Sequence, residues 1–250
     1  MTWANRALVP FYDFSVRRAR FLWTISQYSK AEILEFYPGV RAKDIFVGCS
    51  IDPGFFAPAG PADPKLDGQL HDLKLPPKYL IFVGSLEPRK NIPFLLSLMP
   101  ELAARGYSLV VVSGKAWGSV PVEQILGAPG FPRDRVRFLE FLPIPLLRKI
   151  YENAALYIST SLGEGFGLPQ LEAMACGAPV VCSHNTAMIE VVEGAGLTVR
   201  GWKREDWIDA ILEVGRNREA YVSQGRARVS AYEWESILRG LKIFLSSAGL

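Results

Sequence analysis

The stretch that decides the fold is Leu156–Ser183, which reads LYISTSLGEGFGLPQLEAMACGAPVVCS. It opens with a short apolar run, Leu156–Ser159, and closes with another, Pro179–Ser183. Helical spacing fills Leu168–Cys176 between them. Short apolar runs on either side of a helix predict two parallel strands joined by a crossover helix.

A glycine-rich loop joins the first of these strands to the helix. Gly163, Gly165 and Gly167 alternate along it, and Pro169 stands where the helix begins. Glycine lets a ligand approach the backbone amides, and a helix N-terminus attracts anions. We therefore expect a phosphorylated sugar or a nucleotide at this loop. Glu172, expected in the first helical turn, is placed to accept two hydroxyls of a diol such as ribose.

The same rhythm continues on both sides of this stretch. Apolar runs predict strands at Arg20–Ser26, Asp44–Val47, Tyr79–Gly84, Ser108–Ser113 and Val136–Phe141. Helical spacing predicts helices at Tyr28–Phe36 with Ser29 as its N-cap, Ile92–Arg105, Ile144–Asn153, Ala187–Val192 and Arg204–Arg216. Prolines and glycines over 52–77 predict a loop or linker. The alternation predicts an α/β fold, a doubly wound parallel sheet covered by helices on both faces.

Two loops with chemically suggestive side chains follow strands of this sheet. Ser85–Asn91 follows one strand and Ser161–Gly167 follows another. Ligands of such sheets bind beyond the carboxyl ends of the strands, so we expect the two loops to form one site. Lys90 and Arg89 are placed to neutralise a diphosphate there, Lys90 as a point charge and Arg89 as a fork of donors. The alternative for this loop alone is a solvated surface turn.

The carboxylates Glu164 and Glu172 have three candidate roles. They are general acid and base, ligand-binding groups, or simply loop and helix-terminus residues, with Glu172 complementing the helix dipole. A glycosidase needs two carboxylates across a cleft, whereas these lie on one short element. Their placement beside phosphate-type features favours binding over hydrolysis. His184, Asn185 and Thr186 follow the next strand and are candidate contacts or hydrogen-bonded bystanders.

Composition excludes several classes of protein. The chain has 250 residues, a net charge of +3 and 49% apolar residues. Five of its first thirty residues are cationic, and Asp13 is the only acidic residue among them. The remainder of the chain is close to neutral, which argues against a broad nucleic-acid surface. Aromatic residues share this basic segment, so its alternatives are contact with an anionic membrane and packing on a neighbouring element.

Metal binding and membrane spanning are not expected from the sequence. The chain has three cysteines without a CxxC pair, two histidines without ligand spacing, and no DxD pair. We expect a cytoplasmic protein, because the cysteines are expected to be buried reduced thiols and the sequence has neither an apolar run of about 20 residues nor a signal-peptide pattern. The alternative is a location at the inner face of the membrane.

Five motifs together resemble the retaining GT-B glycosyltransferases of family 4. They are Glu164–Glu172, with the family's two glutamates separated by seven residues, Ala173–Val181, Val83–Asn91, Thr24–Ser29 and Tyr232–Glu235. The resemblance covers nearly the whole chain. It implies transfer of a sugar from a nucleotide-diphosphate sugar, with retention of configuration and without a metal ion or other cofactor.

The resemblance also implies roles for individual residues. Lys90 would bind the diphosphate and stabilise its developing charge, Glu164 would contact the donor sugar, and Glu172 would hold the ribose. Ser85 stands where family members often have an arginine, so Arg89 is the candidate second cation. The remaining residues assigned to substrate binding lie in the same two loops: Gly84, Gly165, Phe166, Gly167 and Leu168.

The form of the first loop is most similar to mannosyl- and rhamnosyltransferases that build surface polysaccharides. This favours a GDP- or dTDP-linked donor over a UDP-linked one, with GDP preferred, and a glycan or lipid-linked acceptor. The resemblance divides the chain into a remnant of the acceptor-side domain at 1–52, a linker at 53–77, a nucleotide-sugar-binding domain at 78–235 and a crossover helix at 236–250. The alternative function is a nucleotide-sugar-binding module that needs a separate partner chain.

Overall fold

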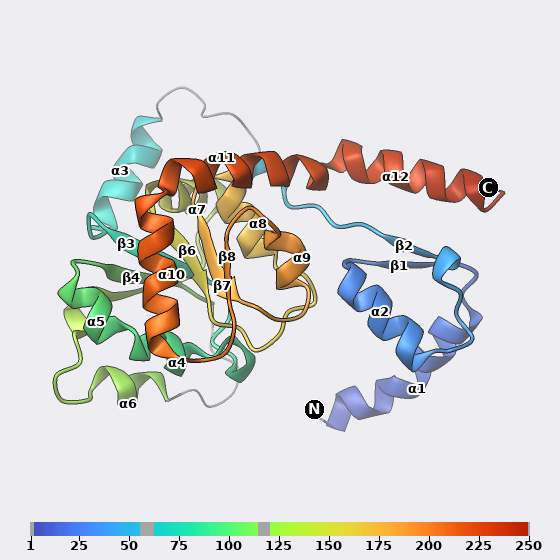
Figure 1. Ribbon diagram of the computed structural model, residues 1–250, viewed down its shortest axis with the longest axis horizontal. Coiled ribbons are helices and arrows are strands. Elements are labelled where there is room, and N and C mark those ends of the chain that lie inside the picture. The colour runs from blue at the N-terminus through green and yellow to red at the C-terminus, as the bar shows by residue number, and fades with distance from the viewer. Residues whose placement is uncertain (1–2, 56–62, 115–120, 250) are drawn as a thin grey trace. The chain divides into compact units, whose positions relative to one another are not determined.

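The structure is a computed structural model that describes residues 3–55, 63–114 and 121–249, with only the backbone described for residues 3–8. The chain forms two compact units (Figure 1). The smaller unit combines Met1–Ser50 with Tyr232–Leu250, and the larger unit is Ile51–Ala231.

A six-stranded parallel sheet organises the larger unit, and the predicted doubly wound α/β fold is confirmed. The strands in chain order are β3 (Tyr79–Val83), β4 (Ser108–Val112), β5 (Val136–Leu139), β6 (Leu156–Ser159), β7 (Val180–Ser183) and β8 (Leu197–Val199). Their spatial order is β5-β4-β3-β6-β7-β8. The chain thus builds outward from β3 in one direction and then returns to build outward from β6 in the other. Such an order has its topological switch point between β3 and β6.

Alternate residues of the central strands face opposite helical layers. Leu80 and Phe82 of β3 belong to one core cluster with residues of α4 (Ile92–Ser97), α5 (Met99–Ala104), α6 (Val122–Leu126) and α10 (Arg204–Arg216). Tyr79 points the other way, and its hydroxyl donates to the carbonyl of Ile150 at 2.7 Å. That carbonyl lies in α7 (Ile144–Asn153), which packs on α8 (Leu168–Ala175). Helix α8 in turn contacts α9 (Met188–Val192) and α11 (Arg218–Val229).

Two predictions in this unit, one of a loop and one of a helix, differ from the structure, and proline residues explain both differences. The predicted loop at 52–77 contains α3 (Pro64–Asp72), where Asp63 caps the helix and Pro64 occupies its first turn. The predicted helix Ile92–Arg105 is two helices, α4 and α5, separated at Leu98. Pro100 lacks the N–H that would continue the first helix, and its ring clashes with the preceding turn.

In the smaller unit, two short parallel strands, β1 (Leu22–Thr24) and β2 (Ile45–Val47), are joined through α2 (Gln27–Phe36). Ser26, not Ser29, caps α2: Ser26 has extended backbone angles and its hydroxyl accepts from the amide of Ser29 at 2.9 Å. A cap must be the last residue outside the helix, and the helix begins at Gln27. The unit also contains α1 (Trp3–Arg18) and α12 (Trp234–Ser247).

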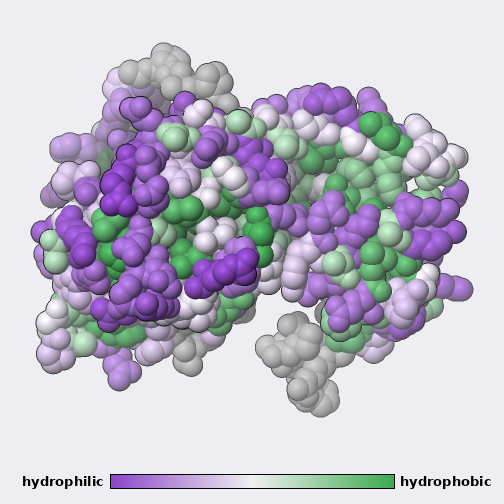
Figure 2. Space-filling view, viewed as in Figure 1, coloured by the Kyte–Doolittle hydropathy of each residue, from purple (hydrophilic) through white to green (hydrophobic). Residues whose placement is uncertain are grey.

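Helix α12 supplies part of the smaller unit's core. The ring of Phe244 lies 5.6 Å from the ring of Phe46 and 5.6 Å from that of Phe21. Several apolar side chains of this unit stay at the surface, as the hydrophobic residues in Figure 2 illustrate. Phe11 is 70% exposed and Phe36 is 68% exposed.

Candidate functional site

The strand order brings the two predicted loops side by side. Because β3 and β6 are neighbours, the chain segments after them leave the same edge of the sheet. The amide of Leu162 donates to the carbonyl of Arg89 at 2.7 Å, and the hydroxyl of Thr160 donates to the carbonyl of Lys90 at 3.1 Å. The predicted site residues therefore gather at the switch point, where open α/β sheets bind ligands.

The carboxylate of Glu164 joins the two loops. One of its oxygens lies 2.5 Å from the Lys90 ammonium and accepts from the Ser161 hydroxyl at 2.7 Å. The other lies 2.5 Å from a guanidinium nitrogen of Arg89. The side chains of Lys90 and Glu164 are only 10% and 11% exposed, whereas that of Arg89 is 48% exposed. The pair of Lys90 and Glu164 is thus largely withdrawn from solvent.

The surroundings of Glu164 favour its charged form. Burial alone would raise the pKa of this carboxyl group, but the Lys90 ammonium and the hydrogen bonds from Lys90, Ser161 and Arg89 outweigh burial. The pKa of Glu164 therefore lies below its ordinary value of 4.5. A carboxylate that stays ionised is suited to accepting hydrogen bonds and poorly suited to acting as a general acid.

A chain of polar contacts orients the first loop. The Ser85 hydroxyl donates to Glu87 at 2.6 Å, and Arg89 donates to the second oxygen of Glu87 at 2.8 Å. These contacts, with the one from Arg89 to Glu164, hold the guanidinium beside Lys90 on the same carboxylate. Arg89 therefore lies beside Lys90, while Ser85 is engaged within its own loop.

Gly84 follows β3 with a φ of 151°, which side-chain-bearing residues rarely adopt. The end of the Lys90 side chain lies at ordinary contact distance, 3.5–3.6 Å, from where a Cβ would be. The amide of Gly84 continues the sheet ladder by donating to the carbonyl of Val112 at 3.0 Å.

Helix α8 begins directly after the glycine loop, as predicted. Gly167 precedes it with a φ of 118°, which side-chain-bearing residues rarely adopt. A Cβ at this position would lie 3.0 Å from the side-chain amide of Gln170. Gly165, Phe166 and Leu168 belong to the same turn, where Phe166 is buried and Leu168 is 42% exposed. This turn presents the helix N-terminus at the switch point.

Glu172 lies in the second turn of α8, so the prediction of a first-turn position is wrong. The helix begins at Leu168, and one turn takes 3.6 residues. Dipole effects fade beyond the first turn, so they do not explain this carboxylate. Tyr151 of α7 contacts this carboxylate, and its hydroxyl donates to Glu172 at 3.0 Å. Burial first, and then the charge of Asp52, raise the pKa of Glu172 above its ordinary value, while the bond from Tyr151 opposes the shift.

The polar residues after β7 support the second loop. The backbone amide of Glu164 donates to the Thr186 hydroxyl at 2.9 Å, and Asn185 donates to the carbonyl of Ser161 at 2.9 Å. The ring of His184 makes a 2.8 Å hydrogen bond with Thr198. Thr186 is thus part of the site's framework, and His184 has the hydrogen bond expected of a bystander.

Sequence reasoning missed Ser161, Glu87 and Tyr151. Glu87 and Ser161 lie inside the two predicted site loops. Glu87 is two positions before Arg89 and Ser161 is three positions before Glu164, and this short spacing is the signal that could have identified them. Tyr151 comes from a helix that is distant in sequence, and no local pattern marks it. Among the described residues, no group of three or more potential metal ligands gathers, and no helix combines the length and apolarity needed to cross a bilayer.

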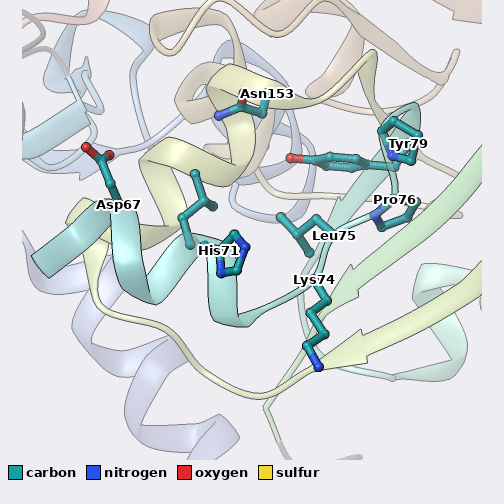
Figure 3. A pocket seen from close by; sticks show the side chains of 9 residues that line it. Asp67, His71, Lys74, Leu75, Pro76, Tyr79 and Asn153 are labelled. Atoms are coloured by element: carbon teal, nitrogen blue, oxygen red, sulfur yellow. The ribbon is translucent and has the colours of Figure 1, made fainter. Parts of the chain in front are cut away.

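A hollow of about 440 Å³ lies elsewhere in the larger unit (Figure 3). Its lining includes Asp67, His71, Leu75, Tyr79 and Asn153. Tyr79 begins β3, so the hollow is beside the amino end of the strand whose carboxyl end carries the two loops. Its size alone does not make it the candidate site, because none of the predicted ligand-binding side chains lines it.

Comparison with curated proteins gives relatives that transfer sugars. The chain is 32% identical over 234 residues to O-antigen chain mannosyltransferase B of Escherichia coli, which covers 89% of this chain and 59% of that protein. It is 25% identical over 223 residues to O-antigen chain mannosyltransferase RfbU of Salmonella typhimurium, with 89% and 58% covered. The chain therefore spans somewhat over half the length of these two relatives.

Solved structures share the fold. HepE of Anabaena in complex with UDP superposes with a TM-score of 0.76 at 21% identity, covering 94% of this chain and 66% of that one. A sucrose-phosphate synthase from Thermosynechococcus elongatus gives 0.74 at 23% identity, covering 94% and 59%. The family model described as glycosyl transferases group 1 matches residues 77–217, more than half of the chain and all of both loops. This protein belongs to the group 1 glycosyl transferases.

Proposed function

We propose that this chain binds the donor of a retaining glycosyltransferase and that it transfers mannose or a related hexose from a nucleotide-diphosphate sugar to a glycan or lipid-linked acceptor. The donor is proposed to be GDP-linked, and the reaction to need no metal ion. The observation that carries the proposal is the meeting of Lys90, Arg89 and Glu164 at the switch point, beside the N-terminus of α8. That arrangement combines two cations, a helix N-terminus and a hydroxyl-accepting carboxylate.

The two charges of the site suit the two parts of such a donor. A diphosphate needs the donors of Lys90 and Arg89, which now contact Glu164. Sugar hydroxyls need an acceptor such as the carboxylate of Glu164. We infer that the donor displaces these internal contacts. Phosphate oxygens then bind Lys90 and Arg89, and sugar hydroxyls donate to the carboxylate of Glu164. A ligand with only one of these parts would leave a largely buried charge unpaired, which is costly.

Glu172 is proposed to hold the ribose of the nucleotide. Its carboxylate has a single hydrogen bond from Tyr151 and no described cation within ion-pair distance, so acceptor capacity remains for two hydroxyls. Its buried surroundings strengthen any hydrogen bond that a diol donates.

In the proposed reaction, the bond from the sugar C1 to the diphosphate breaks as a bond from C1 to the acceptor oxygen forms on the same face. The leaving phosphate oxygen accepts the acceptor's proton. Lys90 and the N-terminus of α8 stabilise the negative charge that develops on that phosphate, which is preorganised electrostatic catalysis. Retention and independence from metal rest on the motif resemblance, and the preference for mannose is supported by the names of the two O-antigen relatives.

A second candidate function is donor binding that supports transfer only with a separate acceptor-side polypeptide. A transfer assay of the 250-residue chain separates the two candidates, because the second predicts donor binding without sugar transfer.

The test of donor binding is thermal unfolding of the chain with GDP, UDP, dTDP and their sugar conjugates. A ligand at a hundred times its dissociation constant adds about 2.7 kcal/mol of stability. For a chain of this size, that raises Tm by roughly 5–10 °C. We expect the largest shift with a GDP-sugar.

Two variants make this measurement specific. Glu172→Gln removes the proposed ribose acceptor and is expected to abolish most of the shift. Glu205→Gln removes an exposed carboxylate of α10 and is expected to leave the shift unchanged. Folded protein that shows no shift with any nucleotide would contradict the proposed donor site, and an equal shift in the Glu172→Gln variant would contradict the ribose assignment.

A further inference from the structure

The smaller unit contains a hollow of about 250 Å³ that is separate from the residues of the donor site. It lies where the end of α1, the segment entering β1 and the segment entering β2 come together. Arg17, Arg20 and Arg41 all line it, together with one carboxylate, Asp44. Its volume is below the range of about 300–1,000 Å³ for drug-sized ligands, which suits a small group.

The charges around this hollow are not balanced. Arg17 contacts Asp13 at 3.1 Å, and Arg41 contacts Asp44 at 2.6 Å. Arg20 has no carboxylate partner among the residues that the structure describes, and its guanidinium lies over the ring of Phe21 at 5.1 Å. One cation at the hollow is therefore left without a counter-ion.

The paired arginines still offer donors to a ligand. Both ion pairs are made through Nε, so the Nη groups of Arg17 and Arg41 take no part in them. The Arg17 guanidinium also lies over the ring of Tyr37 at 5.4 Å, which restrains its orientation. Planar guanidinium forks held in this way match the oxygens of a phosphoryl group, and several forks around one hollow can share its charge.

We infer that this hollow binds a phosphoryl group through Arg17, Arg20 and Arg41. The group belongs either to a soluble phosphate ester or to an anionic lipid headgroup, and both present the same oxygens to the three guanidinium groups. The inference does not depend on the proposed donor site, because all the residues involved lie between positions 13 and 44.

The test compares two neighbouring arginines in the whole chain. Arg20→Gln removes the unpaired cation of the hollow. Arg18→Gln removes the same charge from a residue that does not line it and lies over Phe14 instead. Binding of glycerol 3-phosphate is measured by calorimetry, and binding to phosphatidylcholine vesicles with and without phosphatidic acid is measured by sedimentation. Any phosphate bound at Lys90 is the same in both variants and cancels in the comparison.

We expect Arg20→Gln to weaken binding roughly three- to tenfold and Arg18→Gln to leave it nearly unchanged. Loss of the soluble ester's binding identifies a phosphate-ester site, and loss with the vesicles alone identifies a lipid site. An equal loss in both variants means that diffuse charge attracts the anion, which overturns the inference. Failure of the unsubstituted chain to bind either probe overturns it as well.

A substitution at Gly39 gives an independent check. Gly39 lines the hollow, and an added Cβ there meets no atom within 4 Å, so a side chain is tolerated. Gly39→Asp places a carboxylate beside the three arginines and is expected to block the anion, whereas Gly39→Asn adds the same shape without charge and is expected to weaken binding less. Circular dichroism and Tm of each variant verify that it is folded. Equal effects of the two substitutions would contradict a charge-based site.

Discussion

Glu164 accepts hydrogen bonds from Lys90, Arg89 and Ser161, whereas Glu172 accepts one from the phenol of Tyr151. Both carboxylates come from the same glycine loop and the helix that follows it. The fold lowers the pKa of the first and raises the pKa of the second. A motif of two glutamates thus contains two unlike groups: the protein itself neutralises the charge of Glu164, whereas Glu172 has one described hydrogen bond and no described cation partner.

The strongest test of this comparison removes the buried cation. Lys90→Met leaves Glu164 without its more buried cationic partner, and breaking a buried pair from one side costs about 3 kcal/mol. Urea denaturation at neutral pH measures the loss. Lys149→Met is the control, because Lys149 lies 3.8 Å from Asp67 in an ion pair with 32% and 51% exposed side chains, and such pairs contribute little. Equal losses in the two variants would show that the contact with Glu164 does not stabilise the fold.

Glu164→Gln tests the same network from the other side. A lowered pKa contributes stability that is complete above the ordinary value of 4.5 and is lost as pH falls through the lower, folded value. The variant is expected to lose about 2 kcal/mol at neutral pH and to show a flatter decline of stability between about pH 5 and pH 3. A series of Tm measurements against pH checks this. An unchanged acid limb would exclude Glu164 as its source.

Tyr151→Phe tests the only described hydrogen bond to Glu172. Loss of a donor to a buried carboxylate is expected to cost about 1.5 kcal/mol at neutral pH. Tyr221→Phe is the matched control, since the described contacts of Tyr221 include no hydrogen bond from its hydroxyl. A cost as small as that of the control would mean that solvent already satisfies Glu172.

Glu172→Gln is expected to have the smallest effect on stability and the opposite sign to Glu164→Gln. A raised pKa means that the fold favours the neutral form, so stability is fully present below 4.5 and declines as pH rises through the higher, folded value. The amide removes this decline and is expected to gain up to about 1 kcal/mol at pH 7, or roughly 2–4 °C in Tm. Differential scanning calorimetry without ligand measures it. Destabilisation similar to that of Glu164→Gln would remove the contrast between the two carboxylates.

Local pattern was sufficient for much of the fold. The helices Ile144–Asn153 and Arg204–Arg216 and the strand Leu156–Ser159 have the predicted bounds, because their apolar spacing is regular. The rule that parallel α/β sheets bind ligands beyond the carboxyl ends of their strands also predicts that the two loops share one site, and the structure brings them together at the switch point. Helix α3 does not follow from the sequence pattern, because the prolines around it predict a linker, although Pro64 follows a capping Asp63.

The details of the site required tertiary contacts. Sequence singled out Lys90, Arg89 and Glu164, yet it did not predict that they would contact one another, since no local spacing fixes a bond between two loops more than seventy positions apart. It also misplaced Glu172 by one turn, and so it offered a dipole explanation that the raised pKa contradicts. The ligand roles of these residues remain predictions that the nucleotide and mutational measurements test.

The smaller unit is assembled from two segments that flank the larger unit in sequence, and this has a consequence for synthesis. Phe21 and Phe46 precede the larger unit in the chain, whereas Phe244 of α12, on which they pack, follows it. The larger unit, complete at Ala231, has all of its sequence available before that point. Domains generally fold as units during translation, so the early segment has to wait with its aromatic side chains uncovered while the later one folds. We expect that interval to be when the exposed aromatic side chains make the chain most prone to aggregation.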